Sequence, residues 1–176
     1  MRKYIFLVLL LSLTIMNANS DEDQKENRGF IVKIGDQVPE FTVKLIDGSD
    51  FSNKDFEGKI TMLQFTASWC SVCRTEMPFI EEEIWKVYKD KGLVLVGIDR
   101  DEPLEVVREF AKKTGITYPL ALDPEAAVFA KFAYIKSGIT RSVIIDKNGK
   151  IVFLSRLFER KEFNEMKEVI KKLLES

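Results

Sequence analysis

The chain has 176 residues, a formal net charge of −1 and no histidine. A weakly acidic chain of this length can form one domain with one hydrophobic core, and it gives no electrostatic reason to bind nucleic acid. Its only cysteines are Cys70 and Cys73. The fold therefore does not depend on a disulfide framework, and one chain has too few cysteines and histidines for a usual four-ligand zinc site.

The first twenty residues have the pattern of a secretory signal peptide. Arg2 and Lys3 supply the positive start, and residues 4–16 form an apolar run that is short for a membrane span. The short stretch 18–20 offers a cleavage site before Asp21. Loss of the two positive residues would change the net charge from −1 to −3. We expect an exported, periplasmic protein, and an uncleaved segment that retains it at the membrane is the alternative.

Residues 21–29 are polar and charged, without apolar periodicity, which predicts a flexible tether. We expect residues 30–176 to form a single domain. Apolar runs and alternations predict strands at 41–45, 60–66, 93–98, 118–122, 142–145 and 151–154. Turns are expected at 47–48 and 146–149, and short helical turns at 52–56 and after Asp123.

Three longer segments have the three-or-four-residue apolar spacing of helices. The first follows the cysteines to about Lys91 and should bend near Pro78, which lacks a backbone donor. The second runs from Pro103 to Gly115 with Asp101 as its cap, and the third covers 163–174. Alternation of strands and helices predicts an α/β sandwich around a mixed sheet.

Both cysteines lie where a predicted strand ends and a predicted helix begins. The first turn of a helix has unpaired N–H groups and a partial positive charge, which stabilise a thiolate there. Cys70 would be the outer thiol and Cys73 the inner one, on the same face of the helix. This arrangement predicts redox chemistry between a dithiol and a disulfide. A structural bridge over so short a loop would stabilise little, and a metal site would have to be shared between two chains.

These residues resemble the thioredoxin superfamily, and within it the exported TlpA/ResA-like thiol-disulfide oxidoreductases. The resemblance rests on Gly35-Asp36-Gln37-Val38-Pro39-Glu40-Phe41, on Trp69-Cys70-x-x-Cys73 followed by Pro78, on the insertion at 93–123 and on the hairpin at 142–152. It implies a thioredoxin-like sandwich, a mixed central sheet flanked by helices, with an N-terminal hairpin and a strand-helix insertion.

The resemblance also implies an activity and partners. It implies a thiol-disulfide oxidoreductase, working as a reductase, that needs no cofactor or metal besides the Cys70–Cys73 disulfide. Trp69 would form part of the contact surface beside the sulfurs, with plain packing as the alternative role. Partners would be disulfide-bearing exported proteins or apocytochromes, as in cytochrome c maturation, and a membrane thiol electron donor of the CcdA/DsbD kind.

Three positions depart from the family pattern. Thr140 stands where the superfamily has a cis-proline facing the cysteines, so we expect a trans peptide and an altered substrate-binding loop. Arg141 would then lie near the thiols and lower the pKa of Cys70, or else face solvent.

Gln64 occupies the position of the buried acid of thioredoxin and cannot take a proton from Cys73. Another acid or a water must do so, and Glu125 is the acid we name in its place. The dipeptide Ser71-Val72 matches neither reducing nor oxidising relatives, so it does not give the direction of electron flow.

Two other functions fit parts of the sequence. A thiol peroxidase shares the opening motif, but such enzymes place Thr or Ser three residues before the reactive cysteine, where this chain has Ala67. A non-catalytic docking module would tolerate loss of the cysteines without loss of function.

Overall fold

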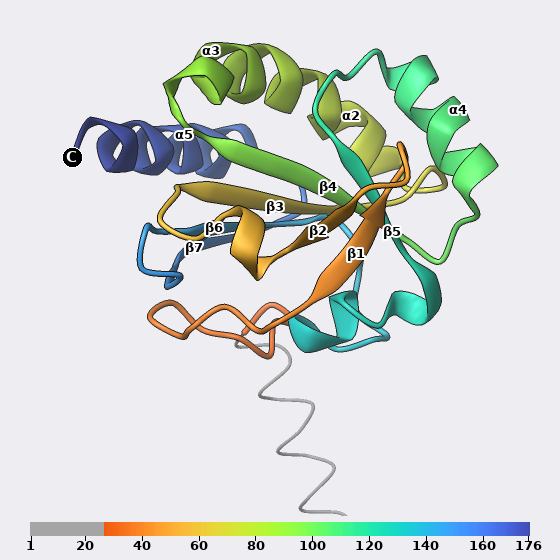
Figure 1. Cartoon of the computed structure of the whole chain (residues 1–176), viewed down its shortest axis with the longest axis horizontal. Coiled ribbons are helices and arrows are strands. Elements are labelled where there is room, and N and C mark those ends of the chain that lie inside the picture. The colour runs from red at the N-terminus through yellow and green to blue at the C-terminus, as the bar shows by residue number, and fades with distance from the viewer. Residues whose placement is uncertain (1–26) are drawn as a thin grey trace, which may run out of the picture.

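One mixed sheet organises residues 27–176, the part of the chain that this computed structural model describes (Figure 1). The strand order is β2-β1-β5-β4-β3-β6-β7. The strands are β1 (Thr42–Leu45), β2 (Asp50–Ser52), β3 (Thr61–Thr66), β4 (Val94–Arg100), β5 (Leu120–Asp123), β6 (Arg141–Ile145) and β7 (Ile151–Arg156). β4 runs parallel to β3 and β5, and the other pairs are antiparallel.

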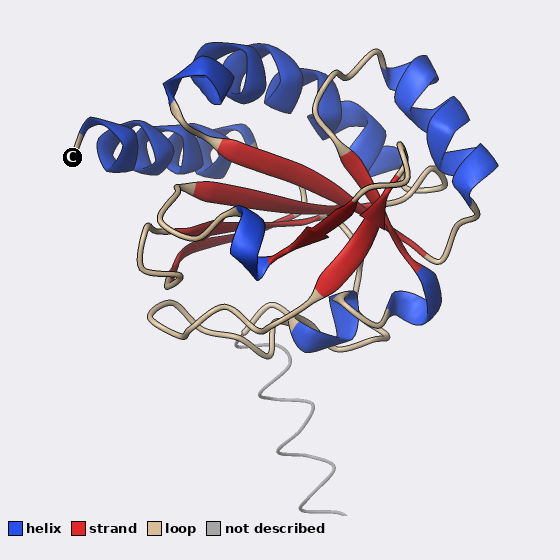
Figure 2. Cartoon of the chain, viewed as in Figure 1, coloured by secondary structure: helices blue, strands red, loops and turns tan. Residues whose placement is uncertain are grey.

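Helices and helical turns cover this sheet. The α-helices are α2 (Ser71–Ile80), α3 (Lys86–Tyr88), α4 (Leu104–Thr114) and α5 (Arg160–Glu175). A π-helical segment, Glu81–Trp85, joins α2 to α3, and single 3-10 turns lie at Asn53–Asp55, Lys89–Lys91, Pro124–Ala126 and Phe129–Lys131. Figure 2 shows the strands as a layer, with α2, α3 and α4 on one side and the turns after β5 on the other.

β3 and β4 form the centre of the sheet because both faces of each strand are covered. All of β3 is buried, and the continuous apolar run of β4 is buried from Leu95 to Asp99. On one face, Phe65 packs its ring against Phe129 and Phe132. On the other, the next residue, Thr66, contacts Met77 of α2. The period of two along β3 therefore sends alternate side chains to two different layers.

The architecture confirms the expected thioredoxin-like sandwich, the hairpin of β1 and β2 and the insertion that carries α4 and β5. The helical run after the cysteines does extend to Lys91, and the π-helical segment begins three residues after Pro78. Asp101 is not the cap of α4. Its φ is 60°, and Pro103 takes the N-cap position because its ψ of 155° is extended.

The predicted signal peptide at 1–20 and most of the predicted tether at 21–29 lie outside the described residues. Within residues 27–176, no helix combines the length and the apolar character that a membrane crossing needs.

Gly97 in the middle of β4 should tolerate no side chain. A Cβ there would lie 2.4 Å from Leu120 Cδ2 and 3.3 Å from Tyr118 Cε2. We expect Gly97→Ala to lower the free energy of unfolding by about 1–3 kcal/mol through overpacking, measured by urea denaturation. Gly138→Ala is the matched control, because its Cβ would meet only Arg156 Nη2, at 3.5 Å. Equal stabilities of the two variants would contradict this reading of the core.

Candidate active site

The two cysteines lie where β3 passes into α2. Cys70 is the N-cap of α2, with an extended backbone, and its Sγ accepts a hydrogen bond from Cys73 N at 3.1 Å. The sulfurs are joined as a disulfide, with 5.3 Å between the Cα atoms. Cys70 is 8% exposed and Cys73 is 0% exposed. Cys70 is therefore the outer sulfur and the one that a partner can reach, in agreement with the prediction.

Thr140 lies directly against both sulfurs. Its Oγ1 is 3.1 Å from Cys70 Sγ and 3.2 Å from Cys73 Sγ. No peptide bond between residues 27 and 176 is cis, so the Ile139–Thr140 peptide is trans, as expected. The carbonyl of Thr140 accepts a hydrogen bond from Leu157 N, which links this loop to the end of β7. Sequence position and geometry thus agree that Thr140 occupies the place facing the cysteines.

Arg141 was expected either to lie near the thiols or to face solvent, and the structure shows a different role. Its guanidinium is buried, so it does not face solvent. It donates to the carbonyls of Gly138 and Arg28 and stacks over the Phe30 ring at 4.4 Å, and none of its hydrogen bonds within residues 27–176 reaches a sulfur. Burial, together with the positive charge of Arg156, lowers its pKa to about 10. Arg141 therefore fastens the start of the described chain to β6.

Trp69 and Pro78 lie on the exposed side of the site. Trp69, next to Cys70, is 60% exposed, so packing in the core does not explain it. Pro78 lies inside α2 and faces outward. A hollow of about 710 Å³ runs between α2 and α4, and it is lined by Ser68, Arg74 and Pro78 on one side and by residues of α4 on the other. The surface beside the sulfurs therefore combines an exposed indole with an open groove.

Gln64 belongs to a buried polar network that reaches α2, the helix that begins at the cysteines. Its Oε1 accepts a hydrogen bond from Tyr118 OH at 2.8 Å, and its Nε2 donates to Glu76 Oε2 at 3.4 Å. Glu76 is thus a buried acid next to Gln64, and it was not among the predicted site residues. Glu125, named in its place, is exposed on the turn after β5 and is wrong for this role. The signal was present in the sequence, because Glu76 follows Cys73 by three residues and so shares its helix face.

The environment of Glu76 changes its acidity. The side chain is 2% exposed, and burial raises its pKa to about 7, an effect that the charge of Glu162 reinforces and the hydrogen bond from Gln64 opposes. A carboxyl group with this pKa can both release and accept a proton near neutral pH. Among the residues of α2 it is the acid that shares the buried face with Cys73.

Glu102 holds the turn that leads to Cys70. Glu102 accepts hydrogen bonds from Ser68 N and from Ser68 Oγ, both at 2.5 Å. Arg74 Nη1 donates to the carbonyl of Ser68, so three contacts fix this residue. Asp99, one residue before the end of β4, is buried within the electrostatic reach of Glu102. Burial, together with the Glu102 carboxylate, raises the pKa of Asp99 to about 8. No local pattern marks these residues, since their pairing depends on the tertiary fold.

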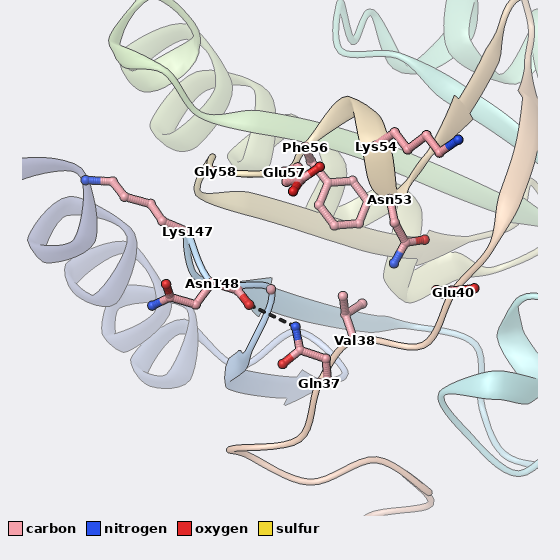
Figure 3. Close-up of a pocket in the computed structure, with 11 residues that line it drawn as sticks. Gln37, Val38, Glu40, Asn53, Lys54, Phe56, Glu57, Gly58, Lys147 and Asn148 are labelled. Atoms are coloured by element: carbon pink, nitrogen blue, oxygen red, sulfur yellow. Dashed lines mark hydrogen bonds between the residues drawn. The ribbon is translucent and has the colours of Figure 1, made fainter.

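A hollow of about 440 Å³ elsewhere on the surface does not belong to this site (Figure 3). Its lining includes Asn53, Gly58 and Asn148, and Gln37 Nε2 donates to Asn148 O at 2.8 Å. Gly58 precedes β3, whereas the cysteines follow it, so this hollow lies at the opposite end of the central strand. None of the predicted site residues lines it.

Comparisons with known proteins agree with the geometry. The sequence profile of the AhpC/TSA family matches residues 34–154. Thiol-disulfide oxidoreductase ResA of Bacillus thuringiensis subsp. konkukian (strain 97-27) is 32% identical over 142 residues, which is 81% of this chain and 79% of that protein. ResA of Geobacillus kaustophilus (strain HTA426) is 30% identical over 151 residues, covering 86% of this chain and 83% of its own.

Solved structures show the same similarity. A putative protein disulfide isomerase from Bacteroides thetaiotaomicron superposes with a TM-score of 0.82 at 54% identity, over 84% of this chain and 94% of that one. A putative thiol:disulfide interchange protein DsbE from Chlorobium tepidum superposes with a TM-score of 0.73 at 26% identity, over 81% of this chain and 99% of that one. The chain therefore belongs to the AhpC/TSA family, has the thioredoxin-like fold and is a thiol-disulfide oxidoreductase.

Proposed function

We propose that the protein reduces disulfide bonds of exported proteins, with Cys70 as the attacking thiol. The observation that supports this role is the position of Cys70 at the N-cap of α2, where its side chain is 8% exposed while that of Cys73 is fully buried. A thiolate at this position is stabilised by the N–H groups of the first helical turn. Cys70 therefore attacks the partner disulfide, and Cys73 reacts in the second step.

The reaction transfers two electrons in two exchanges. The Cys70 thiolate attacks one sulfur of a partner disulfide, forming a mixed disulfide, and the other partner sulfur leaves as a thiolate that takes up a proton. Cys73 then loses its proton and attacks Cys70 Sγ, which releases the second partner thiol and leaves the Cys70–Cys73 disulfide. Glu76 is the group we assign to accept the Cys73 proton, because its pKa is about 7 and it lies on the same buried helix face.

We also propose that residues 1–20 direct the chain out of the cytoplasm, to a periplasm, and that no cofactor besides the disulfide takes part. Exported proteins with disulfides, apocytochromes among them, would be the substrates, and a membrane thiol donor would return the two electrons. This part rests on the signal-like sequence and on the resemblance to the exported TlpA/ResA-like branch.

A thiol peroxidase is the second candidate, because the opening motif at 35–41 resembles that of peroxiredoxins. Ala67 is buried and offers no hydroxyl where such enzymes orient the peroxide. Slow oxidation of reduced Cys70 by hydrogen peroxide in stopped-flow experiments is therefore expected, and rapid sulfenate formation would favour the peroxidase instead.

Cysteine variants test the reductase. Cys73→Ser should accumulate a mixed disulfide with a disulfide-bearing exported protein, because the resolving thiol is gone, whereas Cys70→Ser should neither trap nor reduce it. Non-reducing gel electrophoresis separates these results. The reduction potential of the wild type should lie near −270 mV, the approximate value of thioredoxin. Activity retained by Cys70→Ser, or a potential near the roughly −120 mV of a strong oxidant, would overturn the proposal.

Burial of Glu76 should make stability depend on pH. Its pKa is raised from 4.5 to about 7, so the folded protein gains stability from the protonated form below about pH 4.5 and loses it as pH rises through about 7. Each tenfold change in acid dissociation corresponds to about 1.4 kcal/mol, which makes the full loss about 3 kcal/mol. Glu76→Gln should remove this pH dependence. Between pH 4 and 8, the free energy of unfolding of the variant should therefore rise by about 3 kcal/mol relative to that of the wild type, as measured by urea denaturation.

The exposed Glu168 supplies the control for that experiment, since Glu168→Gln should leave the pH profile of the wild type unchanged. Asp99 contributes equally to all three proteins, so the difference between profiles isolates Glu76. A constant difference between Glu76→Gln and the wild type at every pH would show that the Glu76 carboxyl ionises freely in the folded protein.

Trp69 should matter for partner binding and little for folding. Because the indole is largely exposed, Trp69→Ala should change the free energy of unfolding by less than about 1 kcal/mol. Its loss should lower kcat/KM for a protein disulfide about tenfold, the effect of losing one modest interface anchor. The rate of disulfide reduction by dithiothreitol should not change. Val87→Ala, also an exposed apolar side chain, is the matched control on α3, and equal effects of both variants would contradict a contact role for Trp69.

A further inference from the structure

The hydroxyl of Thr140 is placed between the two reacting atoms. It lies 3.1 Å from Cys70 Sγ and 3.2 Å from Cys73 Sγ, and the residue is 3% exposed. The backbone of Thr140 is held by the hydrogen bond from Leu157 N to its carbonyl, at 3.1 Å. A short rotation of the hydroxyl hydrogen, without movement of the chain, can therefore direct the O–H bond to either sulfur.

Most of the charged groups around the sulfurs are engaged elsewhere, whereas both carboxyl oxygens of the buried Asp99 and Nη2 of Arg141 have no hydrogen-bond partner among residues 27–176. Arg74 and Glu102 bind Ser68, Arg141 binds Gly138 and Arg28, and Glu76 receives the Gln64 amide. Within residues 27–176, the hydrogen bonds that reach the two sulfurs come from the Thr140 hydroxyl and the Cys73 backbone N–H. Thr140 is therefore the side chain whose chemistry acts on the sulfurs most directly.

The strength of this contact depends on the redox state. A disulfide sulfur is a weak hydrogen-bond acceptor, whereas a thiolate carries a full negative charge. Hydrogen bonds to ionised groups are roughly twice as strong as those between neutral groups. The same O–H group therefore stabilises a thiolate more than it stabilises the disulfide.

We propose that Thr140 is a catalytic residue of the exchange reaction, whose hydroxyl donates to the Cys70 thiolate in the first step and to the Cys73 thiolate in the second. When two electrons break the Cys70–Cys73 bond, Cys73 takes up a proton, and the negative charge on Cys70 faces the Thr140 O–H and the Cys73 N–H. After the mixed disulfide forms, Cys73 releases its proton and its thiolate becomes the group that accepts the Thr140 O–H. The hydroxyl keeps its own proton throughout, so it transfers none.

This inference rests on the proposed function in one respect, that Cys70 is the attacking thiol. It departs from what the resemblance implies, since the residue that faces the cysteines in the superfamily is a proline, which has no side-chain donor. A threonine at this position replaces a rigid contact with a hydrogen-bond donor. The expected consequence is a more acidic Cys70 thiol and a more stable reduced state than the same site would have without the hydroxyl.

Two substitutions separate the hydroxyl from the shape of the side chain. Thr140→Val keeps the branched shape and removes the donor, while Thr140→Ser keeps the donor and removes a methyl group. The acidity of Cys70 is read from the pH dependence of its alkylation by iodoacetamide, and the redox equilibrium from titration of the dithiol against glutathione. Both measurements use the full chain and neither needs a protein substrate.

We expect Thr140→Val to lower the acid dissociation constant of the Cys70 thiol about tenfold, the effect of one hydrogen bond to a charged group. Its dithiol–disulfide equilibrium should shift about tenfold toward the disulfide, a potential about 30 mV more negative. Thr140→Ser should stay within about twofold of the wild type in both measurements. Thr140→Ala serves as a second variant without the hydroxyl, should Thr140→Val fail to fold.

Two results would overturn the inference. The first is that Thr140→Val and Thr140→Ala both titrate like the wild type. The second is that Thr140→Ser changes as much as Thr140→Val, which would assign the effect to packing. A failed reductase assignment would appear differently, as the absence of a mixed disulfide in Cys73→Ser with Thr140 intact.

Discussion

The first turn of α2 is the feature on which the whole site depends. Cys70 caps this helix through its sulfur, which accepts the Cys73 N–H at 3.1 Å, where most helices use a side-chain oxygen. The unpaired N–H groups and the helix dipole favour negative charge at this point. The contact that begins the helix is thus also the one that stabilises a Cys70 thiolate, so local structure and reactivity have the same cause.

Loops from three parts of the sheet hold this turn in place. Glu102, after β4, fixes Ser68 just before the cysteines, and Thr140, before β6, lies against the sulfurs. Leu157, after β7, fastens Thr140 in turn. Since β3, β4 and β6 are neighbours in the sheet, their ends meet at one edge and bring these loops together. The sulfurs can therefore change between dithiol and disulfide with little movement of the backbone.

The sequence indicates those parts of this arrangement that depend on local pattern. The apolar run of β4, the strand before Cys70 and the helix after it could all be predicted, because periodicity and capping act over a few residues. Arg141 could not be, because its partners come from far along the chain. Arg28 lies 113 residues away, and it supplies the carbonyl that Arg141 binds. A long cationic side chain is usually solvated, and only the tertiary fold supplies the carbonyls and the Phe30 ring that replace water.

The acidity of the buried carboxyl groups is also set by the tertiary fold and could not be predicted from the sequence. Glu76 and Asp99 appear in the sequence as two negative charges, yet burial raises their pKa values to about 7 and about 8. At neutral pH Asp99 is therefore largely protonated and Glu76 about half protonated. Ionised carboxylates beside the site would oppose a thiolate, so protonation of Asp99 and partial protonation of Glu76 lower the negative charge near the sulfurs.

Gln64 is the neutral partner of the Glu76 carboxyl group. It stands on β3 where thioredoxin has its buried acid, and it donates its amide to Glu76 on α2. The buried acid that we assign to Cys73 therefore lies on the helix that carries the cysteines and not on the central strand, and its spacing from Cys73 is set by the helix itself. For a carboxyl group on the same helix as the resolving thiol, the helix geometry sets its position relative to that thiol, whereas the position of a group on β3 depends on how α2 packs against the sheet.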